Sequence, residues 1–309
     1  MAAITAAMVK ELRDKTGAGM SDCKNALVAS DGDMEIAVEK IREKGLATAA
    51  KKSGRIATEG VVQTLISEDG KTAVICEINC ETDFVGKNQE FRTFVMNVTK
   101  QTLQSNASEV EELLTEAWIA DEALTVKDAL TAIIARIGEN ITIRRFDKMK
   151  LTDVGCFATY IHGGGNMGVL AEISTEKIDD VVKESGYNIC MQIAAMTPKY
   201  VTRDEISQTF ISKEREILRA QAINEGKDEK VVDKMVEGRL TKNLKELCLY
   251  DQGYVRSEEG ATVKKYLEDI SKQVGSPVSI KRFLCYEKGE GLAKKEENFA
   301  EEVSKAMQQ

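Results

Sequence analysis

This sequence has very little proline and no excess of basic residues. Two prolines in 309 residues, with 30% charged residues, favour helices joined by short turns and leave no proline-rich linker. The 43 Lys and Arg residues are outnumbered by 51 Asp and Glu residues, which gives a formal net charge of -8. Direct binding to nucleic acid needs clustered basic residues for the phosphates, so we expect none. A protein partner or a small ligand fits this charge better.

Histidines, paired cysteines and long apolar runs are scarce as well. His162 is the one histidine, so the sequence offers no histidine cluster for a metal site. The seven cysteines are odd in number and lack a C-x-x-C pair, which indicates reduced core thiols in a reducing compartment. No apolar run reaches the roughly eighteen residues that span a bilayer, and the first residues, MAAITAAMVKEL, do not resemble a signal or transit peptide. We therefore expect a cytoplasmic protein with no membrane contact.

The first 45 residues show helical periodicity in three short blocks, each with one apolar stripe. Thr5, Ser21 and Asp33 stand where helix N-caps belong. Glycines of TGAG at 16–19 and Gly45 are placed as helix stops. The pattern predicts a compact three-helix domain, followed at 46–60 by LATAAKKSGRIATEG, a hinge or extended linker.

From Gly60 onward the chain repeats itself. GVVQTLISEDGKTAVICEIN at 60–79 aligns without a gap with GCFATYIHGGGNMGVLAEIS at 155–174, an offset of 155 minus 60, or 95. RIGENITIRRF at 136–146 matches QVGSPVSIKRF at 273–283, an offset of 137. Each copy predicts a strand hairpin, a helical segment and a returning strand. The sequence therefore indicates an α+β fold with a duplicated core and antiparallel sheets.

The two offsets differ by 137 minus 95, or 42 residues, so the second copy carries an insertion. Pro198 ends the preceding helical run, and two charged helical stretches follow that turn at NEGK. Thin apolar stripes predict an antiparallel coiled-coil hairpin, with Ile206, Phe210 and Ile217 facing Val232, Met235, Leu240, Leu244 and Leu247. The predicted domains are 1–56, 57–147, 148–197 with 256–287, the hairpin at 198–255, and a helical module at 288–309 that carries Leu292, Phe299, Val303 and Met307 on one face.

Most motifs that resemble catalytic or cofactor sites lack the context that such sites need. Gly163, Gly165 and Gly168 match G-x-G-x-x-G, but they stand between two predicted strands, whereas a dinucleotide loop leads from a strand into a helix. A cysteine nucleophile paired with His162 would need a group that orients the imidazole, and the sequence shows none. We expect neither an enzyme active site nor a cofactor or metal.

The segment ETDFV at 81–85 follows a buried strand and leaves two interpretations open. In one, Thr82 or Asp83 caps a helix and Phe84 packs into the core. In the other, Phe84 is an exposed aromatic probe with a carboxylate beside it, presented to a partner's pocket.

The chain resembles the bacterial elongation factor Ts family over nearly all of its length. The resemblance rests on TGAGMSDCKNAL at 16–27, TDFV at 82–85, IGENITIRR at 137–145, HGGGNMGVL at 162–170 and KMVEGRL at 234–240, which stand in the family's order. It implies an N-terminal domain similar to ubiquitin-associated domains, a two-part α+β core, a coiled-coil hairpin and a C-terminal helical module.

The same resemblance implies guanine nucleotide exchange on the GTPase elongation factor Tu, in its GDP-bound and nucleotide-free states. It implies that Thr82, Asp83, Phe84 and Val85 enter the GTPase near its nucleotide and dislocate the magnesium ion. Arg13, Met20, Lys24 and His162 match positions that bind the partner. Two alternatives are a non-catalytic adaptor, which leaves the duplicated core unexplained, and a cysteine hydrolase, which lacks a base and an orienting group.

Overall fold

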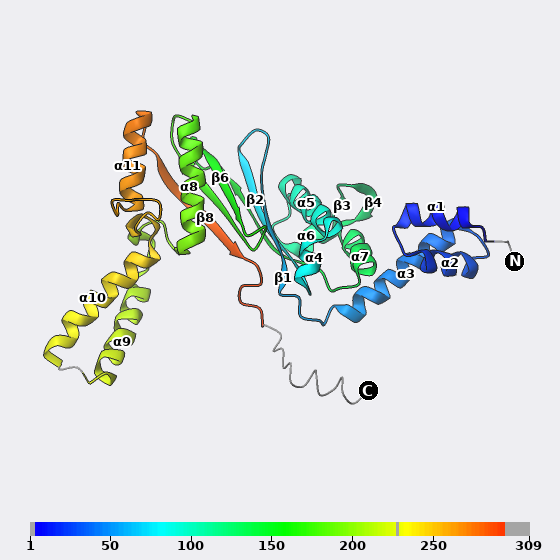
Figure 1. Cartoon of the computed structure of the whole chain (residues 1–309), viewed down its shortest axis with the longest axis horizontal. Helices are drawn as coiled ribbons and strands as arrows, with labels where there is room; N and C mark the ends of the chain where they lie inside the picture. The colour runs from blue at the N-terminus through cyan, green and yellow to red at the C-terminus, as the bar shows by residue number, and fades with distance from the viewer. Residues whose placement is uncertain (1–3, 227–228, 294–309) are drawn as a thin grey trace. The chain divides into compact units, whose positions relative to one another are not determined.

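The structure is a computed structural model that describes residues 4–226 and 229–293 (Figure 1). The chain divides into two compact units. The first unit comprises Met1–Val62, Cys76–Phe146 and Glu287–Gln309, and the second comprises Gln63–Ile75 and Asp147–Tyr286. Most of the predicted C-terminal helical module, with Phe299, Val303 and Met307, lies outside the described residues.

Three helices form the start of the first unit: α1 (Ala6–Thr16), α2 (Met20–Ala29) and α3 (Met34–Lys52). Two predicted caps are confirmed, because Thr5 accepts from the amide of Met8 and Asp33 accepts from the amide of Ile36. The third is wrong: Gly19 caps α2, and Ser21 lies inside that helix. The helices enclose a small core of Val9, Leu12, Cys23, Ala26, Leu27 and Ala37.

Helix α3 continues seven residues beyond Gly45, which corrects two predictions. Gly45 does not end the helix, and residues 46–52 are not an extended linker. Alanine-rich sequence has high helix propensity, and this part of α3 packs against α7 (Val126–Ile137). Gly45 is buried there, opposite Thr131 and Ala135 of α7. The packing of α3 on α7 therefore outweighs the preference of glycine for helix ends.

The first three-stranded sheet has the order β1-β2-β5, with β1 (Glu59–Ile66), β2 (Thr72–Cys80) and β5 (Thr142–Lys150). Between β2 and β5 the chain forms α4 (Asp83–Lys87), α5 (Gln89–Gln104), α6 (Val110–Thr115), a small antiparallel pair β3 (Ala117–Trp118) and β4 (Asp121–Thr125), and α7. One face of α5 carries four apolar residues that are in the core, namely Phe91, Phe94, Val95 and Val98.

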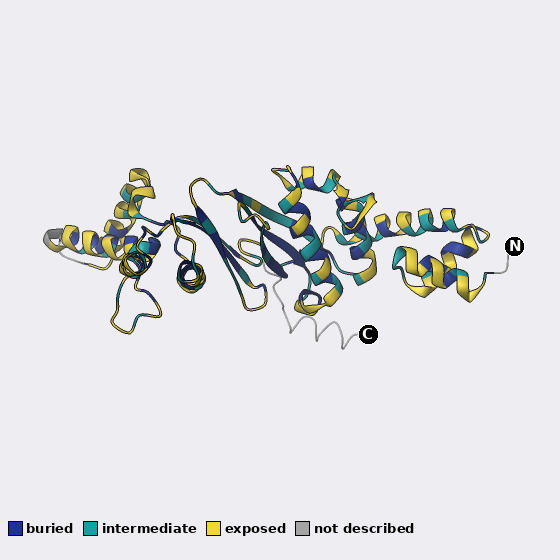
Figure 2. Cartoon of the chain, turned by 90° about the horizontal axis from the view of Figure 1, so that it is seen from above, coloured by how far each residue is buried: buried dark blue, intermediate teal, exposed yellow. Residues whose placement is uncertain are grey.

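The second sheet has the order β6-β7-β8, with β6 (Gly155–His162), β7 (Met167–Ser174) and β8 (Ser279–Glu287). β6 and β7 form an antiparallel hairpin that pairs Gly155 with Ser174 and His162 with Met167. α8 (Asp180–Met196) packs on this hairpin, and α11 (Val263–Val274) packs beside α8 (Figure 1). The central strand β7 is largely buried, β6 and β8 mix buried, half-buried and exposed residues, and the outer faces of the helices are exposed (Figure 2).

The predicted duplication is confirmed by matching elements. β5 and α7 shifted by 137 residues give the bounds of β8 and α11, and the two sheets have the same strand order. The copies also share a buried ion pair: Arg145 Nε lies 2.7 Å from Glu77, and Arg282 Nε lies 2.7 Å from Glu172. These residues are related by the same offsets, since 77 plus 95 is 172 and 145 plus 137 is 282.

The insertion contains α9 (Gln208–Asn224) and α10 (Glu229–Leu247), which pack along each other (Figure 1). Short 3-10 turns flank them at Arg203–Glu205 and Leu249–Asp251. Of the predicted stripe, Ile206, Val232, Leu240 and Leu244 are buried between the helices. Ile217 is 43% exposed, however, and Leu218 is buried in its place. In the described part of the chain, no helix is long and apolar enough to cross a membrane.

Candidate functional site

The segment 82–85 forms the start of α4, a single helical turn between β2 and α5. Thr82 is the N-cap, and its hydroxyl accepts a hydrogen bond from the amide of Val85 (3.4 Å). Asn88 ends α4 and at once caps α5, because its side chain accepts from the amides of Glu90 (2.8 Å) and Phe91 (3.2 Å). Two caps thus fix both ends of a helix that is too short to be stable alone.

Phe84 is 81% exposed, the highest exposure among the large apolar side chains that the structure describes. The next residue, Val85, is buried in the core of the first unit with Phe91 and Phe94. The interpretation of Phe84 as a core residue is therefore wrong, whereas the cap assigned to Thr82 is correct. An exposed phenylalanine on a capped turn leaves about 150 Å² or more of aromatic surface available to a partner.

Asp83 lies at the first position of α4 and is exposed. Lys87, one turn further on, donates to its carboxylate at 2.6 Å. This hydrogen bond is the main reason that the pKa of Asp83 is lowered. Asp83 therefore carries a negative charge at neutral pH beside the exposed ring of Phe84.

Glu139, a residue that the sequence analysis did not single out, holds the beginning of this segment. Its carboxylate accepts from the amides of Glu81 (3.1 Å) and Thr82 (3.0 Å) and from the hydroxyl of Thr82 (2.7 Å). The motif IGENITIRR that contains Glu139 was visible in the sequence, but nothing in it indicated which strand end the carboxylate would reach.

Arg13 on α1 and Met20 and Lys24 on α2 are exposed, and the two helices pack together. Cys23 and Leu27 of α2 are buried in the three-helix core, whereas Met20, at the first position of α2, and Lys24 are exposed next to that buried face. Among the described residues, neither Arg13 nor Lys24 forms an ion pair within the chain. These side chains are free to contact a partner.

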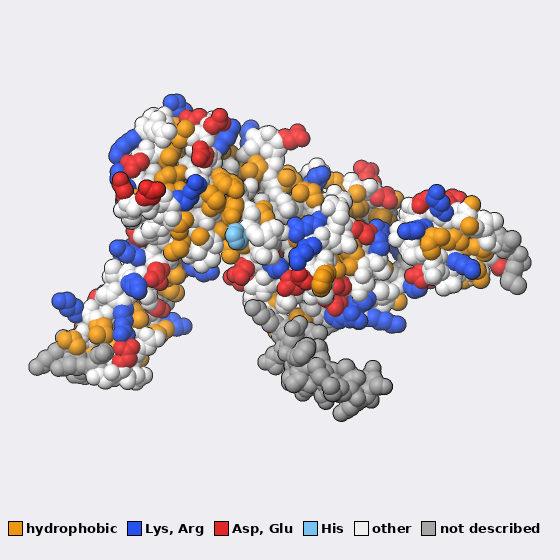
Figure 3. Space-filling model, in the orientation of Figure 1, with side chains coloured by type: hydrophobic (Ala, Val, Ile, Leu, Met, Phe, Trp, Pro, Cys, Tyr) orange, Lys and Arg blue, Asp and Glu red, His pale blue; other side chains and the backbone are white. Residues whose placement is uncertain are grey.

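His162 belongs to the second unit and ends β6 at the hairpin turn. It is exposed, as the pale blue side chain in Figure 3 shows, and its Nδ1 lies 2.9 Å from the hydroxyl of Tyr160. Gly163, Gly164 and Gly165 adopt positive φ in the turn, which favours glycine. Gly163 and Gly165 therefore lie in the turn between two antiparallel strands and Gly168 lies in β7, so the motif leads into a strand and not into a helix, as predicted.

The described residues give little support for a metal site or a reactive cysteine. Within the described residues, no group of three or more His, Cys, Asp or Glu side chains is placed to hold a metal ion. The seven cysteines form no disulfide among the described residues and are buried or half-buried. Burial raises the pKa of Cys80 to about 12 and also raises that of Cys190. Both thiols are protonated at neutral pH and are poor nucleophiles.

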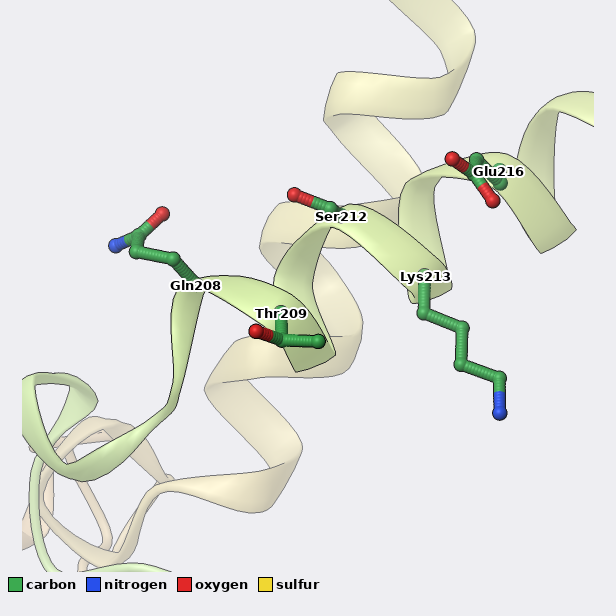
Figure 4. Close-up of a pocket in the computed structure, with 5 residues that line it drawn as sticks. All are labelled: Gln208, Thr209, Ser212, Lys213 and Glu216. Atoms are coloured by element: carbon green, nitrogen blue, oxygen red, sulfur yellow. The ribbon is translucent and has the colours of Figure 1, made fainter.

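A surface depression on α9 carries no ligand site that we can identify. It is lined by Gln208, Thr209, Ser212, Lys213 and Glu216. Figure 4 shows these side chains spread along one helix, without converging on a common point. Small-molecule sites are mostly enclosed and apolar, with a few convergent polar groups.

Comparison with known proteins identifies the family. The profile described as "Elongation factor TS" matches residues 81–290, from the residue before Thr82 to the segment after β8. The elongation factor Ts of Clostridium novyi is 56% identical over 306 residues, which cover 99% of this chain and 99% of the relative. The chain belongs to the elongation factor Ts family. Members from Clostridium tetani (99% of this chain, 100% of the relative) and Clostridium botulinum (99% of each chain) are each 52% identical. As a family member the chain is an elongation factor of protein biosynthesis.

Proposed function

We propose that this member of the elongation factor Ts family is a guanine nucleotide exchange factor for elongation factor Tu. The observation that carries the proposal is the 81% exposure of Phe84 on a one-turn helix whose two ends are capped. A large aromatic side chain held in this way loses little conformational freedom on binding. It is suited to enter a pocket of a partner, and the exchange activity follows from the family to which the chain belongs.

The mechanism is thermodynamic linkage, and no covalent bond changes. If the chain binds the nucleotide-free GTPase more tightly than the loaded one, then the chain and the nucleotide weaken each other's binding by the same factor. Magnesium bridges the phosphate oxygens and offsets their charge, so displacing its ligands weakens nucleotide binding. The chain is thus an exchange factor and not an enzyme with chemistry of its own.

The four residues Thr82 to Val85 have separate parts in this proposal. Thr82 caps α4, and Val85 anchors it in the core. Phe84 is the wedge that enters the GTPase, and the charge of Asp83 acts on the groups around the magnesium ion. Only Phe84 and Asp83 are exposed.

We propose that Arg13, Met20 and Lys24 form a separate binding surface for the GTPase on α1 and α2, and that His162 contacts it from the turn between β6 and β7. Arg13 and Lys24 supply positive charge without an internal ion-pair partner among the described residues, and Met20, at 46% exposure, supplies an adaptable apolar contact. Charged side chains of this kind steer association and fix orientation.

The domain organisation predicted from the sequence is part of the proposal. It comprises a domain similar to ubiquitin-associated domains at 1–56, core parts at 57–147 and at 148–197 with 256–287, a coiled-coil hairpin at 198–255 and a C-terminal module at 288–309. We propose a cytoplasmic protein whose partner is elongation factor Tu, with no direct contact to nucleic acid or membrane. An adaptor role for residues 1–56 alone would leave Phe84 without a function.

The test is to mix the full chain with elongation factor Tu that carries fluorescent GDP and excess unlabelled GDP, and to follow the loss of fluorescence. We expect release to accelerate with chain concentration and to reach a plateau. Excess magnesium should slow the accelerated release. A release rate independent of the chain at every concentration would contradict the proposal.

A further inference from the structure

The connection between β2 and α4 depends on one carboxylate from a distant part of the sequence. Both oxygens of Glu139 are used: Oε2 accepts from the amides of Glu81 and Thr82, and Oε1 accepts from the hydroxyl of Thr82. The same hydroxyl accepts from the amide of Val85 and so caps the helix that presents Phe84. Hydrogen bonds to a charged acceptor are stronger than those between neutral groups.

The loop that carries Glu139 is itself anchored. The ammonium group of Lys52, at the end of α3, donates to the carbonyl of Gly138. The side-chain amide of Asn140 donates to the carbonyl of Arg55 (2.7 Å), and its backbone amide donates to the carboxylate of Glu81 (2.6 Å). Glu139 therefore connects the start of α4 to a fixed support and not to a free loop.

The second copy of the repeat provides a comparison within the same chain. Position 139 plus 137 is 276, a serine whose hydroxyl has no hydrogen-bond partner among the described residues. Residues 175–179 lead directly from β7 to α8, whereas 81–88 lead from β2 to α5 and contain α4. Each copy has its buried ion pair, at Glu77 in the first and at Glu172 in the second. Among the described residues, only the first copy has α4 and the hydrogen bonds of Glu139 that hold its start.

We propose that Glu139 is a positioning residue for nucleotide exchange: it fixes the first turn of α4 and so the direction in which Phe84 meets the partner. The inference rests on the proposed function. The physical reason is preorganisation, because a five-residue helix has few internal hydrogen bonds and would lose entropy on binding if it were not held beforehand. Glu139 touches neither the nucleotide nor the magnesium ion and acts through Phe84.

The experiment is a double-mutant cycle between Glu139→Ala and Phe84→Ala, with release of fluorescent GDP from elongation factor Tu as the readout. We expect Glu139→Ala to slow the maximal release rate about tenfold, as expected for losing hydrogen bonds to a charged group. Glu139→Gln, which keeps an oxygen for the two amides, should remain within about threefold of the unaltered chain. In the Phe84→Ala background, Glu139→Ala should cause no further loss.

Two controls separate positioning from general stability. Glu116 is also half-buried, and it accepts hydrogen bonds from Ser105 and Gln101 at the far end of α5. Glu116→Ala should lower the melting temperature about as much as Glu139→Ala does. It should leave the rate of GDP release unchanged. Hydrogen exchange of the amides of residues 81–85 should become faster in Glu139→Ala and not in Glu116→Ala.

The inference is overturned if Glu139→Ala and the unaltered chain give equal maximal rates of GDP release. It is also overturned if the rate loss of the double variant equals the product of the two single losses. If the unaltered chain does not accelerate release, the proposed function fails instead. Hydrogen exchange then decides the role of Glu139 alone: faster exchange of residues 81–85 in Glu139→Ala supports it, and unchanged exchange overturns it.

Discussion

At the scale of the residue, the buried carboxylate of Glu77 shows how charge contributes to this fold. Glu77 has no exposed surface, yet it accepts from Arg144 Nη1 (2.8 Å), Arg145 Nε (2.7 Å), the amide of Gly289 (2.7 Å) and Asn79 Nδ2 (3.1 Å). Burial alone would raise the pKa of Glu77. The hydrogen bonds from Gly289, Arg144, Arg145 and Asn79 together outweigh burial and hold that pKa below its ordinary value.

The first prediction concerns the replacement Glu77→Gln. We expect it to lower the free energy of unfolding at pH 7 by about 3 kcal/mol, because two arginines lose a buried partner. The folded pKa of Glu77 lies below its unfolded value, so this stabilisation is complete above about pH 4.5 and is lost as the pH falls through the folded pKa. Urea unfolding between pH 3 and 7 should show the two curves converging in acid.

Glu122→Gln, at an exposed position, is the control for that series and should change stability by less than about 0.5 kcal/mol at every pH. A constant difference between Glu77→Gln and the unaltered chain from pH 7 down to pH 3 would contradict the role assigned to the Glu77 charge.

Single residues also mark where sequence reasoning succeeded and where it failed. The sequence left the position of Phe84 open, because an aromatic residue at the start of a helix fits both the core and an interface. Glu139 was missed since its partners, Glu81 and Thr82, are nearly sixty residues away. Such a contact is set by the return of β5 to the edge of the sheet and leaves no local pattern in the sequence.

At the scale of the element, the repeat predicted most of the core, because two copies of a strand hairpin and a returning strand constrain each other. It did not predict α3 beyond Gly45, where tertiary packing outweighs local propensity. The short elements α6, β3 and β4 have no counterpart in the described part of the second copy and were also not predicted. In the hairpin, the sequence predicted Ile217 as the buried residue, but its neighbour Leu218 is buried instead. A narrow apolar stripe on a charged helix fits two adjacent helix rotations almost equally well.

The second prediction follows from the packing of α3. An added Cβ at Gly45 would lie 3.7 Å from the side chains of Ala135 and Thr131, an ordinary contact distance. Gly45→Ala should therefore stabilise the chain by about 0.5–1 kcal/mol through helix propensity. Thermal unfolding followed by circular dichroism measures the shift.

Gly60→Ala is the contrasting control for Gly45→Ala. Its φ of 138° is strained for alanine, and the added Cβ would lie 2.1 Å from the carbonyl oxygen of Ile78. This change should cost about 2 kcal/mol or more. A destabilised Gly45→Ala chain would show that α3 does not pack on α7 as described.

At the scale of the whole molecule, we propose that partner binding and nucleotide release depend on different surfaces of one chain. The third prediction tests this division through Arg13→Ala combined with Lys24→Ala. Both side chains are exposed and form no ion pair among the described residues, so the melting temperature should not change. The chain concentration that gives half-maximal GDP release should rise about tenfold, while the maximal rate stays the same.

Lys127→Ala removes one exposed positive charge from α7, away from the proposed binding surface, and should leave both quantities unchanged. The defect of the double variant should shrink at high salt, because exposed charges are screened. A lower maximal rate with an unchanged half-maximal concentration would contradict the binding role of Arg13 and Lys24.

Phe84→Ala tests whether Phe84 is the wedge that drives exchange, with stability and GDP release measured on the same preparation. Since Phe84 is 81% exposed, its truncation should change the free energy of unfolding by less than about 0.5 kcal/mol, against about 3–5 kcal/mol for a core phenylalanine. Release should slow about thirtyfold, which corresponds to about 2 kcal/mol for an aromatic anchor. Val154→Ala, also an exposed apolar side chain, should leave release unchanged. The wedge role is contradicted if Phe84→Ala is as stable as the unaltered chain and GDP leaves elongation factor Tu at the same rate with either chain.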